Sequence, residues 1–542
     1  MENISKDKYD VIIAGSGLGA LTSAFFLSKV YKKKVLILEK HFVIGGQSHE
    51  FKRRGKYAWD VGLHYVGALE NWRAERLFFD YITENNLKWK KFNELFDVFS
   101  YPDFKIKVSS KPKRYIKELI RNFPKEKKNI KEYFKDLNRA SIWYKIHHLS
   151  NIFPKFVQNI LSFIKKSYEK LAFMTVDEYM NSHFTDDKLK GILGSRWLAY
   201  LSPPREASFA MDSVIAEHYL RGGYYPVGGA SNIAKTITPA IIKNGGKLLT
   251  NSEVTEIIVK DNEAIGVKVT RKENKEYINE EYYAPLIISS VGAYNTYTKL
   301  LPNYNNPQLL EKIKNLTDLK SSVLILYLGL KDSPTTIGLD GCNFLFFDEY
   351  DHNKIYDKSY EIINGKPNHC FISFSSMRKE ENAKFHTAEI IYSIQTEPFD
   401  QWKGQKWRNR DDSYYELKED IANKLLDYVD KKIPGFKDLV DYKDLSTPLT
   451  IEDLVNWEYG KYTGLTPSVD RYKEEWLRAD TPIKNLYLTG CDINSTGIAG
   501  GMMGGIITVS KIMGKFCFNM LFTKSLINKL MSPITSLFKK KK

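Results

Sequence analysis

Near the N-terminus, hydrophobic residues form short unbroken runs that are separated by a glycine-rich turn and a helical repeat. Asp10-Val-Ile-Ile-Ala14 predicts a buried strand that follows directly on Tyr9, and Lys34-Val-Leu-Ile-Leu38 predicts a second one. Between them, residues 21–30 carry apolar positions at helical spacing. The pattern therefore predicts a βαβ unit at the start of the chain.

The turn after the first strand has the composition of a dinucleotide-binding loop. Gly15 allows the tight turn, Gly17 lets the backbone approach a pyrophosphate, and Ala20 permits close packing of helix and strand. The N-terminus of the next helix offers N–H donors and a favourable dipole to the anion. Glu39, 24 residues after Gly15, is positioned to accept the ribose hydroxyls. The predicted dinucleotide site here consists of Gly15, Ser16, Gly17, Leu18, Gly19, Ala20, Glu39 and Lys40.

Length and composition indicate an ordinary globular protein of two or three folding units. The chain has 542 residues, of which 43% are hydrophobic and 27% charged, and this excludes disordered and fibrous classes. Its four cysteines, Cys342, Cys370, Cys491 and Cys517, are widely spaced. That spacing encodes neither a disulfide framework nor a metal site, and it favours a reducing compartment.

The net charge of +16 is concentrated in two zones. Residues 105–170 hold 18 basic and 5 acidic residues, and residues 511–542 hold 8 lysines and no acid. Large apolar residues alternate with the lysines in both zones, which favours an anionic lipid surface over nucleic acid. No run is apolar enough and long enough to span a bilayer. We expect peripheral membrane attachment; core helices with solvated lysine faces are the alternative for the first zone.

Residues 1–8 are polar and charged, and the first strand follows at once. This leaves no room for the apolar core of a signal peptide. We therefore expect a cytoplasmic protein that associates peripherally with a membrane.

Two glycine-containing segments outside the βαβ unit resemble a superfamily of flavoproteins. Gly45-Gly46-Gln47-Ser48 follows the second strand, and Asn485 to Asp492 predicts a strand that delivers an aspartate to the glycine-rich residues 497–505. These segments resemble those that embrace FAD in phytoene desaturases, carotenoid isomerases, monoamine oxidases and retinol saturases. The resemblance implies that Asp492 bonds the ribityl chain and that the helix near Gly497 points its positive end at the flavin. It adds these FAD-binding candidates: Gly45, Gly46, Gln47, Ser48, Val254, Gly490, Asp492, Gly497 and Ile498.

Within that superfamily, the chain resembles the all-trans-retinol 13,14-reductases. Residues 59–67, Trp-Asp-Val-Gly-Leu-His-Tyr-Val-Gly, look like the D-x-G-x-H-Y-x-G signature of that family, and residues 446–450 and 481–490 are similar to two more of its stretches. The resemblance implies hydride exchange between FAD and a carbon–carbon double bond of a polyene. His64 and Tyr65 are the candidate catalytic residues, with Tyr224 and Tyr225 as further proton donors. A buried structural role is the alternative for His64. His147 and His148 have no metal-ligand spacing and are expected on a surface or helix face.

The expected fold class is α/β, with a discontinuous Rossmann-like FAD-binding domain and an inserted α+β substrate domain. We assign residues 1–75, 222–299 and 470–512 to the first, residues 76–221 and 300–469 to the second, and residues 513–542 to a basic membrane-associating tail. An amine oxidase, an isomerase without net redox change and a flavin-bearing recruiter of partners remain alternatives. No second dinucleotide fold is recognisable, so an unidentified electron donor or acceptor is expected.

Overall fold

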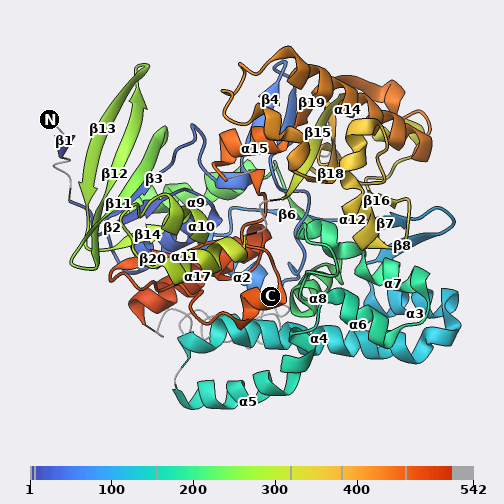
Figure 1. The fold of residues 1–542 in the computed structure, drawn as a ribbon, viewed down its shortest axis with the longest axis horizontal. Coiled ribbons are helices and arrows are strands. Elements are labelled where there is room, and N and C mark those ends of the chain that lie inside the picture. The colour runs from blue at the N-terminus through green and yellow to red at the C-terminus, as the bar shows by residue number, and fades with distance from the viewer. Residues whose placement is uncertain are drawn as a thin grey trace, which may run out of the picture.

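Three large β-sheets and a block of helices organise the chain in the computed structural model (Figure 1). The structure describes residues 3–4, 8–153, 155–317, 320–379, 383–457 and 460–514. The predicted basic tail, residues 513–542, therefore lies outside the described residues except for its first two.

A five-stranded parallel sheet forms the centre of the dinucleotide-binding part. Its order is β10 (Lys247–Leu249), β3 (Val35–Leu38), β2 (Val11–Ala14), β14 (Ile287–Ser289) and β20 (Leu486–Leu488). Residues of β2, β3 and β14 are all buried, as parallel strands with both faces covered require. The strands come from three distant parts of the sequence, so the predicted α/β class with a discontinuous Rossmann-like domain is confirmed.

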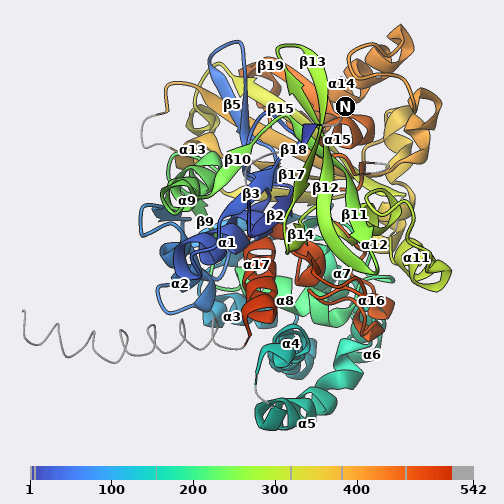
Figure 2. The ribbon, with the colours of Figure 1, turned by 90° about the vertical axis from the view of Figure 1, so that its left-hand side faces the viewer.

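Three helices lie side by side next to this sheet, with the first of them between the other two (Figure 2). Helix α1 (Leu18–Phe25) continues as a π-helical turn, Phe26–Val30, and contacts both α9 (Ser231–Lys243) and α17 (Gly497–Met513). The pattern placed the first helix at 21–30, whereas the helix begins three residues earlier, at Leu18, directly after its N-cap residue Gly17.

A four-stranded sheet extends from one side of the molecule, at the left in Figure 1. Its order is β1 (Asn3–Ile4), β13 (Glu276–Tyr283), β12 (Glu263–Glu273) and β11 (Ser252–Lys260). Strand β11 begins beside Glu39, whose carbonyl accepts from Ser252 N at 2.8 Å. The sheet thus brings Val254 toward the predicted dinucleotide site.

A seven-stranded mixed sheet forms the second part of the molecule. Its order is β19 (Val440–Ser446), β15 (Ser321–Leu330), β18 (His386–Gln395), β17 (His369–Ser373), β16 (Asn343–Phe347), β7 (Leu95–Ser100) and β8 (Lys105–Ser109). All its pairs are antiparallel except β16 with β7. Helix α14 (Asp412–Lys432) packs against β19. All seven strands fall within 76–221 and 300–469, although the domain boundaries themselves stay a prediction.

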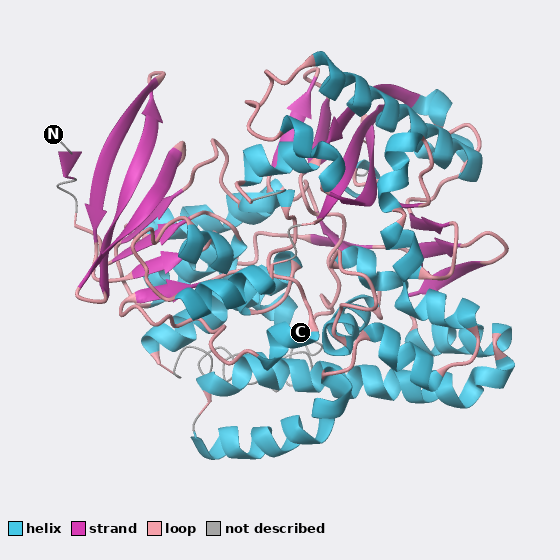
Figure 3. Ribbon diagram, in the orientation of Figure 1, coloured by secondary structure: helices cyan, strands magenta, loops and turns pink. Residues whose placement is uncertain are grey.

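The helices that follow β8 gather below that sheet (Figure 3). They are α3 (Pro112–Asn122), α4 (Lys127–Leu149), α5 (Lys155–Ala172), α6 (Val176–His183), α7 (Asp187–Gly194) and α8 (Phe209–Tyr219). Helix α4 is the inner one, since Trp143, Tyr144 and Ile146 are all buried. The expectation that His147 and His148 lie at a surface is wrong: they are 4% and 9% exposed, and both rings pack edge-on against Tyr472 from a distant segment.

Shorter elements connect these layers. Two small antiparallel pairs are β4 (Glu50–Arg53) with β5 (Tyr57–Asp60), which form a hairpin, and β6 (Trp89–Lys91) with β9 (Tyr224–Pro226), which are far apart in the sequence. The remaining helices are α2 (Ala74–Ile82), α10 (Ala293–Thr298), α11 (Pro307–Asn315), α12 (His352–Asp357), α13 (Ser376–Lys379), α15 (Pro448–Val455) and α16 (Val469–Lys473). Over the part of the chain that the structure describes, every helix is too short or too polar to cross a bilayer.

Candidate functional site

A cavity of about 620 Å³ lies between the five-stranded and the seven-stranded sheets. At one end its walls come from the carboxyl ends of β2, β3, β14 and β20, where the open sheets of α/β proteins bind their ligands. At the other end its walls come from β15, β16, β17 and β18. The cavity therefore joins the predicted dinucleotide site to the predicted substrate domain.

The glycine turn and the end of β3 are locked together by Glu39. One carboxylate oxygen accepts from Ser16 N at 2.8 Å and from Ser16 Oγ at 2.5 Å, and the other accepts from His41 N at 2.8 Å. Gly15 has φ +90°, a conformation that L side chains rarely adopt. The predicted ribose-binding carboxylate is thus held in the cavity wall beside the turn.

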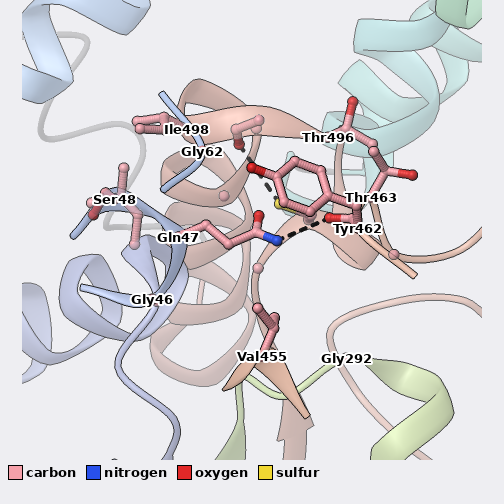
Figure 4. A pocket seen from close by; sticks show the side chains of 18 of the residues that line it. Gly46, Gln47, Ser48, Gly62, Gly292, Val455, Tyr462, Thr463, Thr496 and Ile498 are labelled. Carbon is pink, nitrogen blue, oxygen red and sulfur yellow. Dashed lines mark hydrogen bonds between the residues drawn. The ribbon is translucent and has the colours of Figure 1, made fainter. Parts of the chain in front are cut away.

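The second glycine pair packs directly on the first turn. A Cβ on Gly46 would lie 2.9 Å from Gly17 Cα, so only glycine lets these two backbones approach. Gln47 turns its amide toward the far wall and donates from Nε2 to the carbonyl of Tyr462 at 3.0 Å (Figure 4). This bond ties the N-terminal segment to the loop that precedes α16.

Two helices point uncapped N-termini at the cavity. Gly17 and Thr496, the N-cap residues of α1 and α17, make no side-chain capping bond. Thr496 and Ile498 line the site (Figure 4), and so does Gly497 between them. A Cβ on Gly497 would meet nothing within 4 Å, so a cradle opens there. Free N–H donors and two positive dipole ends suit an anionic group.

Asp492 is buried and already holds two backbone segments. Its Oδ2 accepts from Ala293 N at 2.8 Å and its Oδ1 accepts from Leu465 N at 2.9 Å. Arg471 braces the same strand end by donating to the carbonyls of Leu465 and Asp492 at 2.7 and 3.0 Å. The carboxylate retains acceptor capacity toward the cavity, which it lines. Its predicted bond to the ribityl chain stays a prediction.

His64 and Tyr65 both line the cavity, and burial shifts the pKa of both side chains. Burial, reinforced by the Arg378 cation, lowers the pKa of His64 to about 4, and its Nδ1 has no hydrogen-bond partner among the described residues. Burial raises the pKa of Tyr65, whose hydroxyl donates to Asp97 at 3.2 Å. His64 is therefore a neutral imidazole at neutral pH, and its catalytic role stays a prediction.

The end of the cavity at the seven-stranded sheet is walled mainly by apolar side chains: Leu63, Val66, Leu198, Leu201, Val214, Ile215, Val323, Leu345, Phe371 and Ile391. Such a wall suits an elongated apolar molecule. Polar groups are interspersed at a few points, notably Arg196 and His218.

Of the residues predicted from the sequence, all but Ala20, Tyr224 and Tyr225 line this one cavity. The two tyrosines are buried away from it, and the Tyr225 hydroxyl donates to Asp60, so neither is placed to give a proton there. Ala20 is fully buried in α1, in keeping with a packing role. The sequence reasoning missed Glu253, which pairs with Lys40 at 3.0 Å, together with Trp457, Tyr462 and Arg196. The glycines at 460 and 464 flank Tyr462 and could have pointed to its loop.

Comparison with known proteins identifies relatives over nearly the whole chain. Residues 13–81 match the NAD(P)-binding Rossmann-like domain. An all-trans-retinol 13,14-reductase from Danio rerio is 32% identical over 530 residues, which cover 93% of this chain and 86% of that protein. The chloroplastic prolycopene isomerase 1 of an Oncidium hybrid cultivar is 26% identical over 502 residues, 89% of this chain and 80% of that one.

Solved structures share the fold at low sequence identity. A putrescine oxidase bound to putrescine superimposes with a TM-score of 0.60 at 14% identity, covering 94% of this chain and 99% of that one. An oxidoreductase from Methanosarcina mazei gives a TM-score of 0.57 at 15% identity, covering 93% and 99%. Both support the architecture described above.

Proposed function

This chain belongs to the family of the all-trans-retinol 13,14-reductases, and from that premise we propose that it is an FAD-dependent oxidoreductase whose substrate is a lipophilic polyene. The observation that carries the proposal is the single cavity with two different ends. One end is built from glycines and helix N-termini, and the other from apolar side chains. A dinucleotide and an apolar chain can therefore meet inside it.

The dinucleotide end fits FAD in its geometry. The cradle at Gly497, the close approach of Gly46 to Gly17 and the uncapped helix termini leave room and donors for a pyrophosphate and a flavin. When bound, FAD supplies a hydride donor or acceptor at N5 of its ring. We assign the pyrophosphate to the N-terminus of α1, the ribose to Glu39 and the flavin ring to the N-terminus of α17.

The chain's own residues contribute orientation and exclusion of water. Leu345, Phe371 and Ile391 extend the apolar wall away from the flavin end, so a conjugated chain can lie along it while its double bonds approach the flavin. His64 and Tyr65 stay our candidates for proton transfer beside the reacting carbon. Because His64 is neutral at neutral pH, we propose that its Nδ1, unpartnered among the described residues, accepts a proton, directly or through a water.

An amine substrate fits this cavity less well, despite the fold shared with putrescine oxidase. The wall at the seven-stranded sheet is mainly apolar, so a protonated amine would lose its hydration there, and Arg196, the charged side chain that lines that end, is itself a cation. An isomerase without net redox change is the stronger alternative, because the prolycopene isomerases are also similar over most of the chain.

Product analysis distinguishes these reactions. Photoreduced holoenzyme is incubated without oxygen with all-trans-retinol, a carotenoid or prolycopene, and the extracts are analysed by mass spectrometry. A reductase gives a product heavier by two hydrogens, whereas an isomerase gives an unchanged mass with altered retention. If every polyene is recovered unaltered, the proposed function is wrong.

We propose that electrons come from, or leave to, a separate partner: a diffusible reductant, a flavoprotein or a quinone. One flavin stores a single hydride, so net reduction of a double bond needs replenishment for each turnover. The dinucleotide fold recognised in the sequence is the one assigned to FAD, which leaves a second cofactor to the partner.

We also propose that the protein attaches to an anionic lipid surface through α5, from the cytoplasmic side. Phe156, Ile160 and Phe163 are 69%, 61% and 77% exposed, and they lie on one face of that helix at spacings of four and three residues. Lys166 and Lys170 lie beside them and are exposed. An apolar stripe edged by lysines is the arrangement that peripheral helices use at anionic membranes.

The position of α5 supports this proposal. It lies at the lower edge of the molecule in Figures 1 and 2, and it packs on α4 with Lys165 over the Trp143 ring at 5.3 Å. The buried thiols of Cys342 and Cys370 are free, in keeping with a reducing cytoplasm. A substrate dissolved in lipid would then be met at the bilayer face.

A further inference from the structure

A buried ionic group stands at the apolar end of the cavity. Asp97, on β7, is fully buried, and its Oδ2 accepts from Tyr65 Oη and from Arg196 Nη1, both at 3.2 Å. Its Oδ1 accepts from the side-chain amide of Asn343 at 3.0 Å. Three distant segments therefore converge to hold one carboxylate and one guanidinium.

Both carboxylate oxygens of Asp97 accept hydrogen bonds within the protein, whereas most N–H donors of Arg196 do not find an acceptor among the described residues. A guanidinium has five N–H donors, and among the described residues Asp97 is the one acceptor that Arg196 reaches. The Arg196 side chain is 10% exposed and lines the cavity, whereas Asp97 is 0% exposed and does not. The remaining donors are therefore presented to the cavity.

The surroundings make those donors selective. The guanidinium lies over the rings of Phe99 and Tyr219 at 5.3 and 5.4 Å, which fix its plane. Leu198 and Val214 line the same cavity, so few competing polar partners are offered. A donor in such an environment gains much from an acceptor oxygen and nothing from a hydrocarbon.

We infer that Arg196, held by Asp97, is the anchor for a terminal oxygen of the polyene. It would favour a chain that ends in a hydroxyl or a carboxylate over one that ends in hydrocarbon. This inference rests on the proposed function and adds a specificity-determining residue to it. Asp97 is a positioning residue, because it holds the guanidinium and does not itself line the cavity.

Ligand binding to the full-length holoenzyme tests the anchor without requiring turnover. The three probes are all-trans-retinol, all-trans-retinoic acid and axerophtene, the hydrocarbon in which a methyl group replaces the CH2OH of retinol. Affinities are measured by quenching of protein fluorescence. We expect wild type to bind the two oxygen-bearing ligands about 10-fold or more tightly than axerophtene, as a hydrogen bond to a charged group implies.

Variants locate that preference. Arg196→Met combined with Asp97→Asn removes both charges, so no unpaired ion is buried, and the preference should disappear. Arg196→Lys keeps the charge and should retain part of it. Leu345→Ala is the matched control: it removes an apolar contact, so it should weaken all three ligands alike.

Two outcomes overturn the inference on different grounds. Equal affinity of wild type for retinol and axerophtene, or a preference that survives in the double variant, refutes the anchor and leaves the proposed function intact. Failure of wild type to bind any of the three ligands refutes the proposed function, and the anchor with it. If the double variant does not fold, Arg196→Lys takes its place, and an undiminished preference in that variant refutes the anchor.

Discussion

At the scale of single residues, the least expected group is Glu389 in the middle of the seven-stranded sheet. Its side chain is fully buried on β18, with Oε1 accepting from Ser375 Oγ at 2.9 Å and Oε2 unpartnered among the described residues. Burial, and next the nearby Asp60, raise the pKa of Glu389 to about 8. The folded protein therefore keeps this carboxyl protonated at neutral pH.

This gives a pH-dependent stability with a defined sign. In the unfolded chain Glu389 ionises near its ordinary value of 4.5, so folding takes up a proton between about pH 4.5 and 8. Stability from this group is present below 4.5 and is lost as the pH rises toward 8. Glu389→Gln should therefore stabilise the protein at pH 8, by about 1 to 3 kcal/mol, and leave it unchanged at pH 4.5.

Urea unfolding of wild type and Glu389→Gln at both pH values measures the effect. Glu416→Gln, an exposed position on α14, is the matched control and should have no effect at either pH. A Glu389→Gln variant that is destabilised at pH 8, or equally affected at both pH values, would show that Glu389 is ionised in the fold.

The sequence predicted site residues where the signal is local. Gly15, Gly17 and Glu39 lie within one βαβ unit, so their spacing alone indicates what they surround. Arg196 and Asp97 are 99 residues apart and form a site only because the helical block that follows β8 packs back against β7 and β8. No local periodicity encodes that contact, so the anchor was not predictable.

At the scale of elements, α17 explains the glycine-rich run near the C-terminus. A Cβ on Gly504 would lie 2.2 Å from the carbonyl oxygen of Gly490, and one on Gly505 would lie 2.6 Å from that of Gly19. These glycines let α17 lie directly against α1 and the end of β20. The helix can then point its N-terminus at the cavity.

Two alanine substitutions in this helix should affect different properties, one the stability of the fold and the other the retention of FAD. Gly504→Ala should lower the free energy of unfolding by about 1–3 kcal/mol, because the helix must move away, even though alanine favours helices by about 1 kcal/mol. Gly497→Ala meets no protein atom but fills the cradle, so it should weaken FAD retention; its φ of +84° adds a cost of about 1–2 kcal/mol in stability. Unfolding midpoints and FAD content per chain separate the two effects. Full FAD content in Gly497→Ala would contradict the assignment of the cradle.

Helix α5 is where the sequence left two alternatives open. The basic zone divides: α4 buries its aromatic residues as the core alternative expects, whereas Phe156, Ile160 and Phe163 of α5 are exposed. Large apolar residues are interspersed with basic ones in both helices. The packing of α4 between α5 and α8 is what buries the aromatic residues of the first and leaves those of the second exposed.

Membrane attachment through α5 is tested with vesicles that contain phosphatidylserine. Phe156→Ser combined with Ile160→Ser and Phe163→Ser should reduce binding about 10-fold or more without lowering thermal stability, because the replaced side chains are exposed. Added salt should weaken wild-type binding by screening the lysines. Tyr277→Ser with Val259→Ser, exposed apolar positions on the four-stranded sheet, is the matched control. Undiminished binding by the α5 variant would refute this attachment.

At the scale of the whole molecule, function depends on how two sheets enclose one cavity. The discontinuous Rossmann-like part was predictable, because each of its strands carries a glycine motif or an apolar run of its own. The mixed sheet was not, since β16 pairs with β7 across a sequence gap that contains the helical block and part of the Rossmann-like domain. Its apolar wall is what converts a dinucleotide site into a candidate site for lipid chemistry.

Anaerobic titration of the holoenzyme with a polyene or with an amine tests directly whether the cavity takes a polyene substrate. The flavin absorbance is followed throughout. We predict that a conjugated polyene such as all-trans-retinol reoxidises the photoreduced flavin, and that putrescine does not bleach the oxidised flavin. Bleaching by the amine, together with no response to any polyene, would show that the substrate is an amine and not a polyene.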